Sequence, residues 1–181
     1  MTIRRFESTT PAIDPSAYVD PQAVIIGDVI LGKDSSVWPL TSIRGDVNTI
    51  RIGDRTNIQD NSTLHATHDS EYHPGGIVTT IGNEVTVGHQ VILHACTIGD
   101  RCLIGMGSII MDEARVADDV IVGAGSLVTQ KTNLESGYLY IGRPVRKLRA
   151  LSDEEKTYIQ YSAQNYVRLK NRYRQSTDTN D

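Results

Sequence analysis

The chain has 181 residues, a length typical of one domain, and its charged residues nearly balance at a formal net charge of −4. That balance argues against binding to a nucleic-acid backbone, because proteins that do so carry a basic excess. No apolar run approaches the roughly 18 residues that span a membrane, and the N-terminal stretch has no apolar signal region. We therefore expect a cytoplasmic protein in which the two cysteines, Cys96 and Cys102, are buried thiols.

Aliphatic residues recur at every sixth position, while aromatic residues make up only 6% of the chain. A helix needs an apolar spacing of 3.6 residues, and a half-buried strand needs a spacing of two. A spacing of six, with a small or β-branched residue four positions on and often a glycine directly after, predicts a hexapeptide β-helix. The aliphatic anchors are Val19, Ile25, Leu31, Val37, Ile43, Ile52, Ile58, Leu64, Ile81, Val87, Leu93, Ile98, Ile104, Ile110, Val116, Val122 and Val128.

The predicted fold is mainly β, a single parallel β-helix over residues 19–133 that follows an N-terminal segment, 1–18. Three hexads form one coil of a triangular prism, and successive coils stack about 4.8 Å apart through parallel hydrogen bonds. The anchors fill the prism, so large rings are excluded from it. The insertion between Leu64 and Ile81 predicts a loop at 66–80.

The six-residue period fails after Val128, so residues 134–151 are predicted to be an extended connector. Ser152 and Glu155 have the spacing of a helix capping box, which predicts a C-terminal helix over 152–174. Its single apolar face favours packing on the outside of this prism or of a neighbouring one. Residues 175–181 are polar and are expected to fray.

The hexad register places two histidines side by side. Leu64 and Leu93 fall on one face of the prism, face A, in adjacent coils, so His65 and His94 stack about 4.8 Å apart. Such a pair can bind one metal ion, or it can be an ordinary pair of surface histidines. His89 falls on another face, face C, and is not expected to reach the same ion within one chain. Because an open catalytic metal site usually has three protein ligands, the third is expected from another subunit of a cyclic trimer.

The same register places further polar residues near these histidines. Arg44 precedes His65 by one coil on face A, while Gln59 and Asp60 flank His89 on face C. A subunit contact of face A on face C would bring Arg44 toward Asp60 and Gln59 toward the metal.

Three stretches, Ile43–Val47, Arg55–His65 and Val87–Gly99, resemble the γ-class carbonic anhydrase-like family. The C-terminal part, with its YSAQNYV helix, is similar to the bacterial YrdA-type members. This resemblance implies a left-handed β-helix, a homotrimer, and one Zn²⁺ (alternatively Fe²⁺ or Co²⁺) at each subunit interface. The implied metal ligands are His65 and His94 of one chain and His89 of the next.

The resemblance also implies roles for polar residues around the ion. It implies subunit-interface positions at Arg44 and Asp60, and catalytic positions near the metal and its water at Asp46, Asn57 and Gln59. A tyrosine of the connector, Tyr138 or Tyr140, lies near the metal in the family, but simple packing is the alternative here.

Two departures from the family pattern concern proton transfer. Val47 stands where the active archetype has a glutamate, and the loop after His65 is shorter than the acidic loop of the archetype. The proton-relay candidates in this loop are His68, Asp69, Glu71 and His73, unless the loop is only a mobile polar segment. We therefore expect slow turnover.

The leading hypothesis is reversible hydration of CO₂ by a metal held by three histidines. Three neutral imidazoles leave the charge of the ion uncompensated, which can lower the pKa of a bound water from 15.7 to about 7. Hydrolysis of a small ester or thioester could use the same site. A metal-binding trimer without catalysis and a hexapeptide acyltransferase, which typically uses one catalytic histidine and a coenzyme A groove, are the remaining alternatives.

Overall fold

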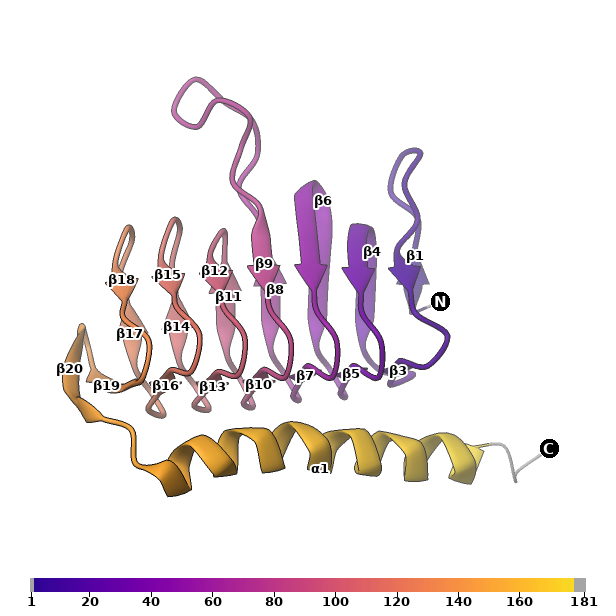
Figure 1. Cartoon of the computed structure of the whole chain (residues 1–181). Coiled ribbons are helices and arrows are strands. Elements are labelled where there is room, and N and C mark those ends of the chain that lie inside the picture. Colours follow the sequence, from indigo (N-terminus) through magenta and orange to yellow (C-terminus); the bar gives the residue numbers. More distant parts are fainter. Residues whose placement is uncertain (1, 178–181) are drawn as a thin grey trace.

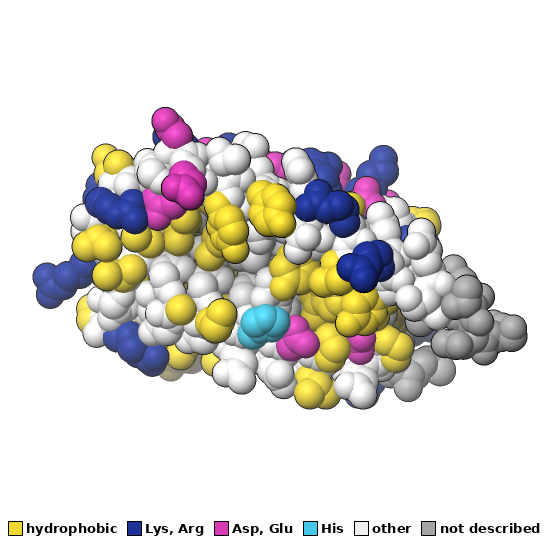
Figure 2. Space-filling model, turned by 90° about the horizontal axis from the view of Figure 1, so that it is seen from below, with side chains coloured by type: hydrophobic (Ala, Val, Ile, Leu, Met, Phe, Trp, Pro, Cys, Tyr) yellow, Lys and Arg dark blue, Asp and Glu magenta, His cyan; other side chains and the backbone are white. Residues whose placement is uncertain are grey.

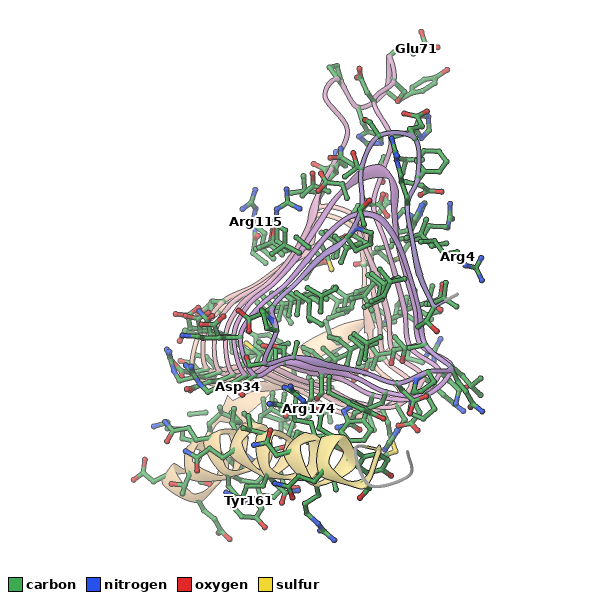
Figure 3. All side chains as sticks on the ribbon, turned by 90° about the vertical axis from the view of Figure 1, so that its right-hand side faces the viewer. Arg4, Asp34, Glu71, Arg115, Tyr161 and Arg174 are labelled. Atoms are coloured by element: carbon green, nitrogen blue, oxygen red, sulfur yellow. The ribbon has the colours of Figure 1, made fainter. Side chains whose placement is uncertain are left out.

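The computed structural model describes residues 2–177 and shows a left-handed parallel β-helix with one long helix along its outside (Figure 1). Viewed down its axis, the β-helix is a triangular prism, and the helix lies against one of its three faces (Figure 3). Most strands have only two or three residues, because the chain turns a corner after each hexad. The predicted fold class is confirmed.

The strands stack coil upon coil on three faces. Face A contains β1 (Ile3–Arg4), the first part of β4 (Val24–Leu31), the first part of β6 (Ser42–Ile52), β8 (Thr63–His65), β11 (Ile92–His94), β14 (Ile109–Ile110) and β17 (Leu127–Val128). Face B contains β2 (Ala12–Ile13), the second parts of β4 and β6, β9 (Thr79–Ile81), β12 (Thr97–Ile98), β15 (Arg115–Val116) and β18 (Asn133–Leu134). Face C contains β3 (Tyr18–Val19), β5 (Ser36–Val37), β7 (Asn57–Ile58), β10 (Thr86–Val87), β13 (Leu103–Ile104), β16 (Ile121–Val122), β19 (Tyr138–Gly142) and the antiparallel β20 (Val145–Ala150).

The interior is filled by the aliphatic anchors, and Ile43, Leu64 and Leu93 among them are fully buried. The small hydroxyl residues at the corners bond the next coil: the Thr56 hydroxyl donates to the Gly82 carbonyl at 2.7 Å. Gly53 is needed beside its anchor, since a Cβ there would lie 2.7 Å from the Gly82 backbone. Close stacking of the coils therefore explains both the small corner residues and the glycines.

Strand pairing continues beyond the predicted limits of 19–133. At the N-terminal end, β1 and β2 pair with β4, so part of segment 1–18 adds to the prism. At the other end, β18 and β19 extend it through the expected connector, and β20 folds back on β19. Leu134 and Tyr140 take anchor positions opposite Val116 and Val122. The predicted series ended too early: Leu134 continues it six residues after Val128, and Tyr140 follows six residues later as an aromatic anchor in the last coil.

The C-terminal helix, α1 (Asp153–Thr177), packs on face C of its own prism. Trp38 on face C meets the Tyr166 ring edge-on at 5.6 Å between centroids. The buried Lys170 ammonium donates to the Ser16 carbonyl and to the Asp34 carboxylate, both at 2.7 Å. Of the two predicted alternatives, packing on its own prism or on a neighbouring one, the helix therefore takes the first.

The ends of α1 follow from its sequence. The capping box forms as predicted, because the Ser152 hydroxyl accepts from the Glu155 N–H and the Glu155 carboxylate accepts from the Ser152 N–H. The helix continues to Thr177, so the first residues of the expected tail are helical, and the rest, 178–181, lie outside the described residues. Within residues 2–177 no helix is long and apolar enough to cross a bilayer. A cytoplasmic location stays a prediction.

The insertion between β8 and β9 forms an arm that projects from the corner between faces A and B (Figure 1). Thr67 and Ile77 pair at the base of the arm. The Asn48 side-chain amide donates to the carbonyls of Thr67, at 3.2 Å, and Gly75, at 3.1 Å. The arm is therefore tied to the coil that precedes it.

Candidate metal site

His65 and His94 lie side by side on face A, as the hexad register predicts. They are direct partners in the β8–β11 pairing, and His65 Nδ1 lies 3.2 Å from His94 Nε2. Two ligands of a tetrahedral zinc ion, at bonds of about 2.0 Å, are about 3.3 Å apart. The ring centroids stay 5.2 Å apart, and the tilt of the rings brings the two facing nitrogens to a separation that suits one shared ion.

Each ring is held from behind by a carboxylate. His65 Nε2 lies 3.1 Å from Asp46 Oδ1, and His94 Nδ1 lies 2.9 Å from Asp112 Oδ1. The second oxygen of Asp112 accepts a hydrogen bond from the Thr67 hydroxyl at 2.6 Å. Carboxylates behind histidine ligands are typical of metal sites, where they orient the ring and raise its basicity.

The carboxylates also decide where the ring protons are. A neutral imidazole has one N–H, and in each ring that N–H donates to its carboxylate, Asp46 or Asp112. His65 Nδ1 and His94 Nε2 therefore both carry lone pairs, so they cannot hydrogen-bond to each other. Two lone pairs that converge at 3.2 Å form an arrangement that a shared cation would stabilise.

The pKa shifts at this pair favour a neutral His65 ring and charged carboxylates. Burial lowers the pKa of His65 below its ordinary value, and this outweighs the hydrogen bond to Asp46, which raises it. Burial raises the pKa of Asp46, but the hydrogen bonds from Arg44 and His65 outweigh it and leave that pKa lowered. The pKa of Asp112 is lowered in the same way, by Thr67 and His94. Neutral imidazole is the form that binds a metal.

Arg44 lies one coil before His65 on face A, as predicted, and its guanidinium bonds the Asp46 carboxylate. Its side chain is about half exposed, at 47%. Arg44 is therefore held at the edge of the histidine pair, with part of its guanidinium open to another group.

His89 is separate from the pair, also as predicted. It lies at the corner after β10, and its Nδ1 is 2.9 Å from Asp60 Oδ2. Its side chain is 46% exposed. Within residues 2–177, no three His, Cys, Asp or Glu side chains of one chain are placed to hold a metal ion. A single chain thus offers two converging imidazoles here and a third elsewhere.

Gln59 and Asn57 project outward from face C and are buried beneath α1. The Gln59 amide donates to Asn57 Oδ1 at 3.0 Å. Gln59 and His89 both line a pocket of about 390 Å³ between α1 and the corner. Figure 2 shows hydrophobic side chains gathered on the side of the molecule that carries α1.

Glycines occupy the position equivalent to Gln59 in the next three coils of face C. Gly88, Gly105 and Gly123 line the pocket and place no side chain at these three positions. A Cβ on Gly88 would lie 2.8 Å from the Met106 nitrogen, so the coil stacking itself requires a glycine there.

For Tyr140 the structure shows the packing alternative rather than a place beside the histidine pair. Tyr140 points into the prism, is 4% exposed, and its hydroxyl accepts from the Glu135 N–H at 2.8 Å. It packs as an anchor of β19 because the last coil has room for a ring. Tyr138 lies beside Lys147, whose Nζ is 4.1 Å from the ring centroid.

The loop candidates for proton transfer lie on the projecting arm, with Glu71 at its far end (Figure 3). Asp69 accepts from the Gly75 N–H at 2.7 Å and so stabilises the arm itself. Val47 is exposed beside Asp46. The cysteines are buried as expected, and burial raises the pKa of each thiol to about 12, so neither acts as a thiolate at neutral pH.

The fold and the histidine pair define a hexapeptide-repeat protein of the γ-carbonic anhydrase-like class. The family model "Bacterial transferase hexapeptide (six repeats)" matches residues 95–130. The chain is 56% identical over 171 residues to protein YrdA of Escherichia coli K12, covering 94% of this chain and 93% of YrdA. It therefore belongs to the hexapeptide-repeat family, in the group that includes YrdA and the γ-carbonic anhydrases.

Two further relatives support this assignment. The chain is 43% identical over 171 residues to the mitochondrial γ-carbonic anhydrase 1 of Arabidopsis thaliana, covering 93% of this chain and 61% of the plant protein. The crystal structure of a hexapeptide transferase family protein from Anaplasma phagocytophilum superposes with a TM-score of 0.88 at 42% identity, covering 95% of this chain and 98% of that one.

Proposed function

We propose that this chain forms a homotrimer that holds one divalent metal ion at each subunit contact and catalyses the reversible hydration of CO₂. The observation that carries the proposal is the pair of converging lone pairs on His65 and His94, 3.2 Å apart and held by two carboxylates. The similarity to a plant γ-carbonic anhydrase supports the type of reaction. Zn²⁺ fits the nitrogen ligands, and Fe²⁺ or Co²⁺ would also suit them.

The third ligand in this proposal is His89 of a second copy. Asp60 engages Nδ1 of His89, which leaves Nε2 available, and the side chain is exposed at a corner of the prism. Contact of face A with that corner would bring Arg44 of one copy toward Asp60 of the next. A cyclic trimer repeats this contact three times with identical surfaces.

When bound, a divalent ion lowers the pKa of a water molecule from 15.7 to about 7 and so supplies a nucleophile at neutral pH. Asp46 and Asp112 keep the two imidazoles in their binding orientation. Gln59, beside His89 in the pocket, orients the reacting groups with its amide. These residues supply orientation and a neutral donor set, which leaves the charge of the ion uncompensated.

Proton release is the expected slow step. Val47 cannot carry a proton, and the titratable residues of the arm, Glu71 among them, lie on a segment that points away from the prism (Figure 3). The rate of hydration should therefore rise with the concentration of a small buffer such as imidazole, which can carry the proton instead.

The test combines metal analysis, a size measurement and stopped-flow CO₂ hydration. The protein loaded with Zn²⁺, Co²⁺ or, without oxygen, Fe²⁺ should contain about one ion per chain and behave as a trimer. His94→Ala, which removes one ligand from an otherwise intact coil, is the matched control. A rate no higher than that of the free metal at the same concentration would refute the proposed activity.

Hydrolysis of a small ester or thioester is the second candidate. The 390 Å³ pocket beside His89 favours it, because CO₂ needs far less room. A screen of ester and thioester substrates against the metal-loaded trimer separates the two reactions. Metal without turnover in either assay would indicate a non-catalytic metal-binding trimer. Metal bound by all three histidines would argue against an acyltransferase, which typically uses one catalytic histidine.

A further inference from the structure

A chain of buried polar side chains connects α1 to Gln59. Asn57 and Thr86 are direct partners in the β7–β10 pairing, and the Asn57 amide donates to Thr86 Oγ1 at 3.0 Å. The Thr86 hydroxyl lies 2.9 Å from the hydroxyl of Ser162 on α1. At the other end, Gln59 donates to Asn57 Oδ1 at 3.0 Å. The chain therefore runs Ser162, Thr86, Asn57, Gln59.

The direction of each hydrogen bond follows from one group that can only accept. The Asn57 nitrogen also faces the Val85 carbonyl at 3.4 Å, so the NH₂ of Asn57 must lie on that side. Asn57 Oδ1 then faces Gln59 and must receive an N–H from it. Since the amide of Gln59 is planar, its carbonyl oxygen faces away from Asn57.

Ser162 lies at the other end of the chain of hydrogen bonds and accepts the proton of Thr86. Thr86 Oγ1 accepts from Asn57, so the Thr86 proton needs another acceptor, and among the described residues the Ser162 hydroxyl is the one within reach. Without Ser162, that buried proton can turn only toward Asn57, where it competes with the long 3.4 Å hydrogen bond to the Val85 carbonyl for the orientation of the Asn57 amide. A reversed Asn57 would in turn reverse Gln59.

We propose that Ser162 and Thr86 are positioning residues that set the amide of Gln59 so that its carbonyl oxygen faces the pocket shared with His89. An acceptor that lines this pocket selects groups that donate a hydrogen, such as water or the hydroxyl of bicarbonate, over unprotonated carboxylates. The inference rests on the proposed function only in taking this pocket as the place of the reaction.

The direct test follows the side-chain amide of Gln59 by NMR in the trimer labelled with ¹⁵N-glutamine, the signal being identified by its loss in Gln59→Glu. Thr86→Val keeps the shape of threonine without its hydroxyl, and Ser162→Ala removes the acceptor on the helix. Both should shift the Gln59 amide signal and speed its proton exchange. Thr86→Ser and Ser162→Thr, which keep a hydroxyl, should show the Gln59 amide signal at its wild-type position and with its wild-type exchange rate. The control Ser126→Ala removes a buried hydroxyl two coils away from Thr86 and should leave the signal unchanged.

Activity gives a second readout. In the zinc-loaded trimer, Ser162→Ala should lower kcat by about two- to tenfold, the usual range for one lost hydrogen bond, with zinc content unchanged. An unchanged Gln59 signal in both Thr86→Val and Ser162→Ala would overturn the inference, even if the melting temperature falls. A shifted signal in a protein that does not hydrate CO₂ would support the inference and refute the proposed activity, so the two failures are distinguishable.

Discussion

Removal of the carboxylate behind His94 tests the metal site most directly. Asp112 accepts the Nδ1–H of His94 at 2.9 Å, and its side chain is only 19% exposed. Asp112→Ala frees the ring to turn and lets its proton move to Nε2, the nitrogen that faces His65. Both changes weaken metal binding, because a ligand must be deprotonated and correctly aimed.

The magnitude follows from the kind of hydrogen bond that is lost. A hydrogen bond to a charged group contributes about 1.5–3 kcal/mol, which corresponds to a rise in Kd of about 10- to 150-fold. Loss of a partner behind a metal ligand typically costs about 10- to 100-fold in affinity. Asp112→Asn keeps an oxygen for the His94 N–H but loses the charge, so its Kd should rise less than that of Asp112→Ala.

The assay is zinc affinity by competition with a chelator, on variants shown to have the size and circular dichroism of the wild type. Asp100→Ala is the matched control, because Asp100 accepts a backbone N–H from Asn83 at another corner of the prism. It should leave the zinc affinity unchanged. If Asp112→Ala binds zinc as tightly as the wild type, the carboxylate does not support a metal ligand and the reasoning fails.

Three other substitutions test the assembly and the fold. His89→Ala should lose bound zinc but keep the circular dichroism of the β-helix, because the side chain is exposed and the core does not use it; full retention of zinc would contradict its role as the third ligand. Arg44→Ala should weaken the trimer, measured by sedimentation at nanomolar concentration, and a variant that stays fully trimeric would exclude a bridge from Arg44 to a second copy. The hydrogen bond from Arg149 lowers the pKa of Glu155 to about 2, below its ordinary 4.5. The stability that this adds is present above about pH 4.5 and is lost as the pH falls toward 2, so Glu155→Gln should flatten that part of the pH dependence of urea unfolding; an unchanged profile would contradict the assignment.

The hexad register predicted the fold and part of the candidate site well, because stacking converts sequence spacing directly into distance. Counting in sixes places His65 opposite His94, and the structure pairs them directly. The same count separates His89 from them and places it beside Asp60. Few folds allow this, since in most folds residues far apart in sequence meet through tertiary packing that no period describes.

Residues outside the period could not be found in this way. Asp112 lies one residue beyond the level of His94 in the next coil, and its orientation depends on the Thr67 hydroxyl at the base of the arm. Ser162 meets Thr86 only because α1 packs on face C, and the sequence left open which prism the helix covers. The sequence also left open whether Tyr140 packs, since an aromatic anchor departs from the aliphatic pattern.

The geometry of a β-helix face explains why the proposed three-histidine site takes one ligand from a second molecule. Two neighbouring coils place side chains about 4.8 Å apart, and two rings can lean together to the roughly 3.3 Å that tetrahedral ligands require. A third histidine in the same column would start about 9.6 Å from the first, in line with the other two, and no leaning could bring all three around one ion. In this chain the next residue of that column is Met111. Ile110 pairs with Leu93, so Met111 stands opposite His94. In the proposed site the third ligand therefore approaches from outside the face, which is the role proposed for the exposed His89 of a neighbouring copy.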